Sequence, residues 1–177
     1  MFFWRDRPVG TSLWQRFRTA PEGFTASEEE GGYWAFHVVA GTDRIVELFL
    51  AMLSELPAEV SVEIDDKRAG RAWKGERRAV AAVRAALDPL RALLAAHGGV
   101  EVTVFTEDDQ LTLNPKLELF IYSHSQRWAP RLAGKGLDEQ RLVRTRSWRT
   151  STVDVAPVPA LSAAVSAAAA ALSLEAA

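Results

Sequence analysis

The residues of this sequence best suited to metal chemistry are two pairs of consecutive aspartates. Asp65-Asp66 ends a segment in which apolar and polar residues alternate, and Asp108-Asp109 follows a second segment of the same kind. Parallel strands bring their carboxyl ends to one edge of a sheet, where open α/β sheets bind ligands. If both segments are parallel strands, we expect the four carboxylates to meet and to hold Mg²⁺ or Mn²⁺, which prefer oxygen ligands. Metal-assisted hydrolysis or phosphoryl transfer would be the corresponding reaction.

The same aspartates also have a purely structural explanation. Asp-rich turns commonly end strands that have no function. The spacing of these residues also matches no established metal or phosphate motif. We therefore favour a structural role and expect no cofactor, with Mg²⁺ or Mn²⁺ as the alternative.

His124 is the best candidate for a catalytic base. It follows the alternating segment 117–121 and stands between Ser123 and Ser125. Adjacent side chains of an extended chain point in opposite directions, so this triplet does not by itself form a serine–histidine pair. The sequence contains no G-x-S-x-G, H-E-x-x-H, G-x-G-x-x-G or Walker motif. No catalytic residue is assigned on this basis, and an enzyme is the less favoured interpretation.

Tryptophan beside basic residues is the other unusual feature. The chain has six tryptophans, and five of them lie within two residues of an arginine or lysine. Trp and Arg are enriched among the residues that anchor protein interfaces, and they also build platforms for single-stranded nucleic acid. Alternatively, the rings pack inside the fold beneath arginine side chains. The residues assigned to binding are Trp73, Arg127, Trp128, Trp148 and Arg149.

Charge is segregated along the chain, although the net charge is only −2. Residues 21–66 carry eleven acidic residues against Arg44, whereas residues 67–96 carry eight basic residues against Glu76 and Asp88. Such blocks form either solvated faces that pair with one another or a polar surface that recognises a partner. The negative net charge disfavours nucleic acid as that partner.

These features favour a small bacterial, cytoplasmic protein that binds another protein, or a second copy of itself, without catalysis. The first alternative is a divalent-metal hydrolase or phosphotransferase, and the second is single-stranded nucleic-acid binding. The absence of cysteine excludes disulfides and thiolate sites and suits a reducing compartment. The N-terminus lacks the pattern of a secretory signal. The Ala-rich tail, interrupted by Pro157 and Pro159, predicts no membrane span.

Hydrophobic periodicity predicts the elements that would position these residues. Alternation with a period of two predicts strands, and apolar residues three and four apart predict helices. The predicted strands cover 23–26, 33–40, 60–66, 100–106 and 117–123, with an added edge strand over 141–155. The predicted helices cover about 11–18, 42–56 and 76–97, the last with a kink at Asp88-Pro89. The predicted loops cover 66–75 and 124–140.

The order of these elements predicts one α/β (or α+β) domain over residues 1–156 and an Ala-rich tail or docked helix over 157–177. Two strand–helix–strand units imply parallel strands, because a parallel connection needs the length of a helix. We therefore expect a mixed, partly parallel sheet of about five to six strands, two main helices and a C-terminal Ala-rich helix. Strands 33–40, 60–66 and 100–106 would then point the same way, which the metal site requires.

Overall fold

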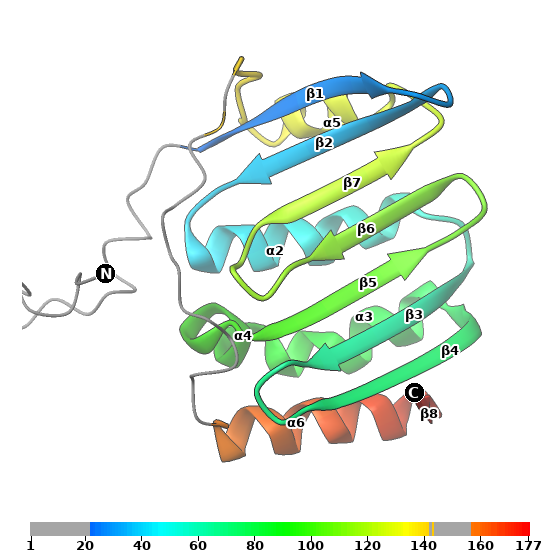
Figure 1. Ribbon diagram of the computed structural model, residues 1–177, viewed down its shortest axis with the longest axis vertical. Coiled ribbons are helices and arrows are strands. Elements are labelled where there is room, and N and C mark those ends of the chain that lie inside the picture. The colour runs from blue at the N-terminus through cyan, green and yellow to red at the C-terminus, as the bar shows by residue number, and fades with distance from the viewer. Residues whose placement is uncertain (1–21, 142, 144–156) are drawn as a thin grey trace, which may run out of the picture.

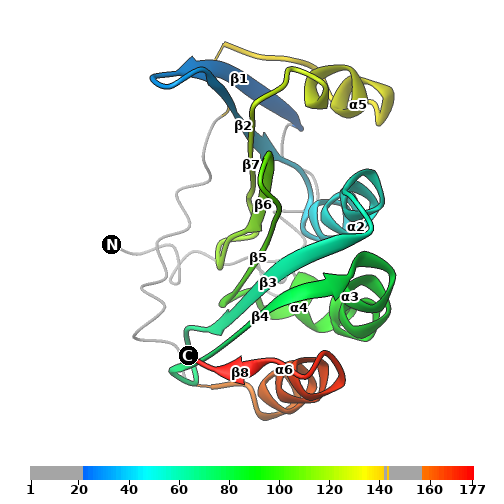
Figure 2. The ribbon, with the colours of Figure 1, turned by 90° about the vertical axis from the view of Figure 1, so that its right-hand side faces the viewer.

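One antiparallel β-sheet, covered by helices on a single side, forms the framework of this protein. The computed structural model describes residues 22–141, 143 and 157–177. Within these residues the sheet has eight strands in the order β1-β2-β7-β6-β5-β3-β4-β8 (Figure 1). The helices all lie on one side of the sheet, and no described helix lies on the other side (Figure 2).

The elements have the following bounds. The strands are β1 (Gly23–Glu29), β2 (Tyr33–Val39), β3 (Glu59–Asp66), β4 (Arg71–Ala79), β5 (Val100–Phe105), β6 (Asp109–Leu113), β7 (Leu119–Ser123) and β8 (Glu175–Ala176). The helices are α2 (Thr42–Met52), α3 (Val80–Leu87), α4 (Arg91–His97), α5 (Trp128–Gly134) and α6 (Pro159–Ala171), with 3₁₀ turns η1 (Leu53–Glu55) and η2 (Asp88–Leu90).

Side-chain alternation divides each strand between two environments. In β3, Val60, Val62 and Ile64 are buried, whereas Glu63 and Asp65 belong to the opposite face. Residues directly across from one another on neighbouring strands share a face, so the same division continues through β5, β6 and β7. The side of the sheet without a described helix is called the open face below.

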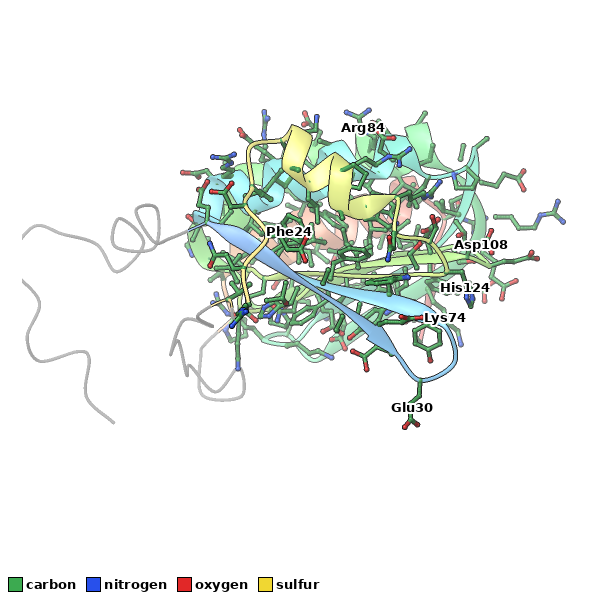
Figure 3. The ribbon with its side chains drawn as sticks, turned by 90° about the horizontal axis from the view of Figure 1, so that it is seen from above. Phe24, Glu30, Lys74, Arg84, Asp108 and His124 are labelled. Atoms are coloured by element: carbon green, nitrogen blue, oxygen red, sulfur yellow. The ribbon has the colours of Figure 1, made fainter. Side chains whose placement is uncertain are left out.

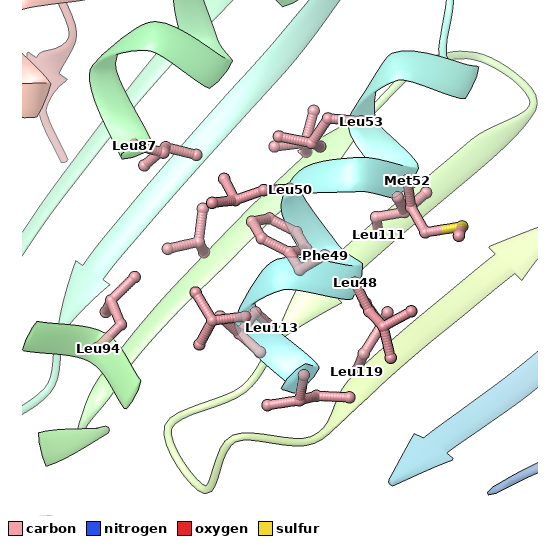
Figure 4. Close-up of a cluster of buried hydrophobic side chains, with 14 of the residues drawn as sticks. Leu48, Phe49, Leu50, Met52, Leu53, Leu87, Leu94, Leu111, Leu113 and Leu119 are labelled. Atoms are coloured by element: carbon pink, nitrogen blue, oxygen red, sulfur yellow. The ribbon is translucent and has the colours of Figure 1, made fainter. Parts of the chain in front are cut away.

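Apolar side chains hold the helices against the covered side of the sheet. Phe49 and Met52 from α2 belong to one buried cluster with Leu111 and Leu113 from β6 and Leu87 from α3 (Figure 4). Each of these five side chains is 0–1% exposed. Full burial of a side chain of this size stabilises a fold by about 1.5–3 kcal/mol, so α2 is a principal anchor of the helical layer.

The prediction of a mixed, partly parallel sheet of five to six strands is wrong. All seven neighbouring pairs of strands are antiparallel. The reason is β4, which occupies the second half of the predicted loop 66–75 and the start of the predicted helix 76–97. Because β4 reverses the chain before α3 begins, α3 and α4 return it to a strand, β5, that points opposite to β3. β2 and β3 do point the same way, but three strands separate them.

Other predicted elements are confirmed. The first two predicted strands form the β1–β2 hairpin, the helix predicted from residue 42 is α2, and the Ala-rich tail contains α6. The predicted kink at Asp88-Pro89 is the 3₁₀ turn η2 between α3 and α4. The sequence analysis missed β6, β8 and α5, which lies in the predicted loop 124–140.

Two predicted elements lie outside the part of the chain that the structure describes. These are the helix at 11–18 and nearly all of the edge strand at 141–155. No helix in the described ranges is long and apolar enough to cross a membrane.

Candidate functional site

The two aspartate pairs lie at opposite ends of the sheet. Asp66 is paired with Val100, the first residue of β5, whereas Asp108 and Asp109 come after Phe105, the last residue of that strand. A strand of six residues is about 20 Å long, so the structure does not bring the four carboxylates together. The parallel arrangement that would have gathered them is the part of the fold prediction that is wrong.

Asp109 is the centre of a buried polar cluster. Its carboxylate accepts hydrogen bonds from the Ser123 hydroxyl at 2.7 Å and from the Trp128 indole N–H at 2.8 Å. The guanidinium of Arg127 also donates to it and forms an ion pair. Asp109 itself is 5% exposed and Trp128 is 0% exposed. These contacts hold α5 against the first residue of β6, so the role of Asp109 is structural.

Asp66 has the same kind of role at the other end of the sheet. It is 1% exposed and accepts hydrogen bonds from the backbone N–H groups of Arg68 and Ala69 at 3.2 and 3.1 Å. The Ser162 hydroxyl of α6 donates to its second oxygen at 2.7 Å. Asp66 therefore closes the β3–β4 turn and fastens α6 to the sheet.

Each aspartate pair thus has a buried member and a more exposed member. Strand alternation explains the first pair, because Asp66 shares the covered side with Ile64 while Asp65 shares the open face with Glu63. Within the described ranges, no three His, Cys, Asp or Glu side chains form a group that could hold a metal ion.

Of the five residues assigned to binding, the structure describes Trp73, Arg127 and Trp128. Trp128 is fully buried, with the guanidinium of Arg127 at 5.1 Å from the centre of its ring. Trp73 is half-buried on β4 and packs against the core cluster. Trp148 and Arg149 lie outside the described residues. For Trp128 and Trp73, packing within the fold accounts for the positions observed.

His124 lies at the edge of the open face. Its ring meets the ring of Tyr33 edge-on at 5.8 Å, and its backbone N–H donates to the carbonyl of Asp108 at 3.1 Å. Figure 3 shows His124 and Asp108 together at one end of the sheet. The side chain is exposed, and no hydrogen bond from Ser123 or Ser125 reaches its ring in the described structure. The geometry gives His124 no activated nucleophile.

The most distinctive surface is a hollow in the centre of the open face. It encloses about 590 Å³. Its walls combine two carboxylates, three aromatic groups and four neutral polar side chains, and none of these described lining residues is basic. We call this hollow, lined by Glu63, Glu101, Thr103, Phe105, Gln110, Thr112, Asn114, Phe120 and Tyr122, the central hollow.

Three further hollows extend the central hollow across the open face. One shares Phe105, Gln110 and Tyr122 with it and continues to Tyr33 and His124 at the end of the sheet. The other two share Glu63 with it and lie over β3, β4 and the C-terminal residues. Tyr33 and Tyr122 are each 39% exposed, the highest exposure of any large apolar side chain in the described ranges. Exposed aromatic area in a continuous depression is typical of a binding surface.

A small charge cluster borders the central hollow. Asp65 and Glu101 lie directly across from each other on β3 and β5, an arrangement that destabilises a sheet when both are charged. Lys67 lies between them, forming an ion pair with Asp65 and lying 3.8 Å from Glu101. The hydrogen bond to Asp65, opposed by partial burial and supported by the charges of Asp65 and Glu101, raises the pKa of Lys67. Lys67 therefore masks part of the acidic character of this surface.

A histidine and a glutamate lie beside Phe120, at the opposite margin of the hollow. The His37 ring stacks on Phe120 with 4.4 Å between ring centres, and its Nε2 lies 3.5 Å from a carboxylate oxygen of Glu118. The Asn114 amide donates to the same Glu118 oxygen at 3.2 Å. The stacked His37 ring thus packs against Phe120, one of the aromatic walls.

The sequence analysis did not single out the central hollow as a site. The residues that line it come from four strands and a turn. In the sequence, some of them appear only as the polar residues of an alternating pattern, and the others show no pattern. Period-two alternation could have placed Glu101 and Thr103 on one face, but the order of the strands was needed to bring them beside Glu63 and Thr112.

Comparisons of the chain with models of protein families, with curated proteins and with solved structures found no match. The function is therefore inferred from the geometry of the open face.

Proposed function

We propose that this protein is a non-catalytic binding module whose open face holds a basic, aromatic-bearing segment of another protein. The observation that supports this most directly is the composition of the central hollow. It presents two carboxylates and three aromatic groups on a sheet face that no described helix covers. Such a surface attracts cationic side chains by charge and can stack guanidinium groups on its rings.

The shape of the hollow favours a chain segment over a small molecule. Pockets for small ligands bury 70–90% of the ligand surface. The central hollow is built on one face of one sheet, by β3, β5, β6 and β7 with the turn after β6. It has no opposing wall among the described residues. A segment lying along a continuous depression suits this shape, because its side chains can enter successive hollows.

A charge reversal at the hollow tests the proposal. The probe is a fluorescein-labelled peptide of alternating arginine and tryptophan, and the measurement is fluorescence anisotropy. The double substitution Glu63→Lys/Glu101→Lys is expected to weaken binding by at least about tenfold, because like charges facing one another across an interface are strongly unfavourable. The matched control is Glu47→Lys/Glu55→Lys, which makes the same charge change at exposed positions of the helical layer. Equal affinity of the two double variants would refute the proposal.

Single-stranded nucleic acid is the second candidate for the open face. Aromatic rings on an uncovered antiparallel sheet are the way in which several RNA-binding domains stack bases, and Phe105, Phe120 and Tyr122 have such positions. Glu63 and Glu101 would repel the phosphates, so we favour protein. An oligonucleotide that binds with a steep salt dependence, while the arginine–tryptophan peptide does not bind, would reverse that order.

Removal of Lys67 should have the opposite effect to the charge reversal. In Lys67→Met, Glu101 and Asp65 lose their nearest cation, and the surface becomes more acidic. We expect the labelled peptide to bind about two- to fivefold more tightly, the scale of one partly exposed ion pair. The control is Lys116→Met, at an exposed lysine in the turn after β6. Unchanged or weaker binding by Lys67→Met would contradict an electrostatic role for Glu101.

A further inference from the structure

We infer that residues 1–21 of the same chain are the resident ligand of the open face, docked within the molecule and displaced when a partner binds. This inference rests on the proposed function, because it names a segment that meets the chemistry of the central hollow. The segment carries four arginines against one aspartate, together with five aromatic residues. These are Arg5, Arg7, Arg16 and Arg18, with Phe2, Phe3, Trp4, Trp14 and Phe17.

The charges and rings of the segment complement those of the hollow. The lining of the central hollow has two carboxylates and no basic residue within the described chain. Glu63 makes no ion pair with any described residue. The exposed rings of Tyr33 and Tyr122 offer flat surfaces of the kind on which Arg and Trp side chains stack.

The position at which the segment joins the sheet makes this docking easy to reach. The segment leads through Glu22 directly into β1, whose first residue, Gly23, pairs with Val39 at the carboxyl end of β2. Successive antiparallel pairings place the start of β5, with Glu101, at that same end of the sheet. Four strand spacings separate β1 from β5, which is about 19 Å.

Chain length favours an intramolecular contact over capture of a second molecule. The length of residues 1–21 allows a fully extended reach of about 70 Å, which exceeds the distance from β1 to the central hollow. A short tether that can reach its site gives an effective concentration in the millimolar range. A contact of modest affinity would therefore be occupied in most molecules. A partner must then compete with the tethered segment, so a higher concentration of the partner is needed to occupy the site.

Paramagnetic relaxation in the full-length chain tests the docking. The chain has no cysteine, so a single introduced cysteine can be spin-labelled without background. Gln110→Cys puts the label on the open face, at an exposed position of β6. Arg84→Cys puts the label on the exposed outer side of the helical layer (Figure 3). We expect loss of most of the indole signal of Trp4 and Trp14 with the first label, and retention of both signals with the second.

Three outcomes would overturn the inference. The first is equal loss of the two indole signals with either label. The second is loss that appears only when a spin-labelled chain is mixed with an isotope-labelled, unmodified chain, since the ligand would then be a second copy. The third is undiminished loss in Glu63→Lys/Glu101→Lys, since the carboxylates would then not hold the segment.

The arginine–tryptophan peptide separates this inference from the proposed function. Replacing Arg5, Arg7, Arg16 and Arg18 with Ser removes the tethered competitor without touching the hollow. The added peptide should then bind about tenfold more tightly than to the unmodified chain, as expected for loss of a millimolar intramolecular competitor. Equal binding to both chains would overturn the docking and leave the proposed function standing. Binding to neither chain would remove the proposed function itself.

Discussion

Replacing Asp109 with alanine is expected to lower the free energy of unfolding by about 3–5 kcal/mol, because each buried donor left without an acceptor costs about 1–3 kcal/mol. The carboxylate accepts hydrogen bonds from Ser123 and Trp128, and both donors would remain buried without it. Arg127 would lose its counter-charge at the same time. Chemical denaturation with urea, followed by tryptophan fluorescence and circular dichroism, measures the loss.

The neighbouring residue provides a matched control for Asp109. Asp108 is exposed, and no ion pair involves its side chain within the described chain. Asp108→Ala should therefore change the free energy of unfolding by no more than about 0.5 kcal/mol. Similar losses for the two substitutions would contradict the structural role given to Asp109. Strong binding of Mg²⁺ by the unmodified chain, abolished by either substitution, would instead favour the metal site suggested by the sequence.

The open face and the covered face could be separated from sequence by alternation alone. In the segments that became β3 and β5, every second residue is Val or Ile, and these residues are the buried ones. Alternation does not indicate in which direction a strand runs or which strands lie beside it. The four aspartates were predicted to meet because three strands were assumed to be parallel. One reversed strand, β5, was enough to separate the pairs.

The elements that were missed have weak sequence signals for identifiable reasons. β4 lies next to the short edge strand β8, so few of its side chains are buried and only Trp73 packs against the core. Its pairing with β3 is also interrupted by a register shift between Val60 and Val62. A strand with little buried surface has little reason to keep apolar residues at every second position. Its sequence, rich in arginine, therefore suggests a loop.

Two further elements were hidden by residues that usually interrupt regular structure. In β6, the inward-facing series is Asp109, Leu111 and Leu113, and the buried carboxylate makes the start of the strand resemble a turn. In α5, Pro130 is the third residue of the helix, where a missing N–H leaves no intrahelical bond unmade. Both residues are compatible with their elements once tertiary contacts are known. Sequence alone gives the opposite impression.

The carboxylates on the two faces of the sheet differ in how fully they are paired. The buried carboxylates, Asp66 and Asp109, have their hydrogen-bonding capacity occupied by partners within the fold. The carboxylates of the open face, Glu63 and Glu101, are less fully paired. Glu63 makes no ion pair within the described chain, although Lys74 lies across from it on β4, and Lys67 lies 3.8 Å from Glu101. Groups that are already satisfied stabilise the structure, whereas unsatisfied groups on a concave surface are available to a ligand. This contrast is why the open face, and not the aspartate pairs, is the candidate site.

Asp66→Ala should cause the second large loss of stability, about 2–4 kcal/mol, because two backbone N–H groups and the Ser162 hydroxyl would lose a buried acceptor. The substitution would also remove the negative charge beside Arg68. Burial lowers the pKa of Arg68, and the charge of Asp66 partly offsets this by raising it. Asp66→Asn retains an oxygen acceptor, so it should cost less than Asp66→Ala. Urea denaturation of both variants, with Asp65→Ala as the half-exposed control, measures the difference.

The link between Asp66 and α6 can be isolated by a double-mutant cycle. Ser162→Ala alone should cost about 1 kcal/mol, the typical contribution of one hydrogen bond. Combined with Asp66→Ala, it should cost almost nothing more, since the acceptor is already absent. Full additivity would show that the hydroxyl and the carboxylate act independently, and α6 would then be held by Leu161, Val165 and its other apolar contacts alone. A coupling near the size of the single Ser162→Ala loss would instead identify this buried pair as the polar fastening of the C-terminal helix. It would also explain why an aspartate that resembles a metal ligand in sequence is unavailable to a metal in the folded chain.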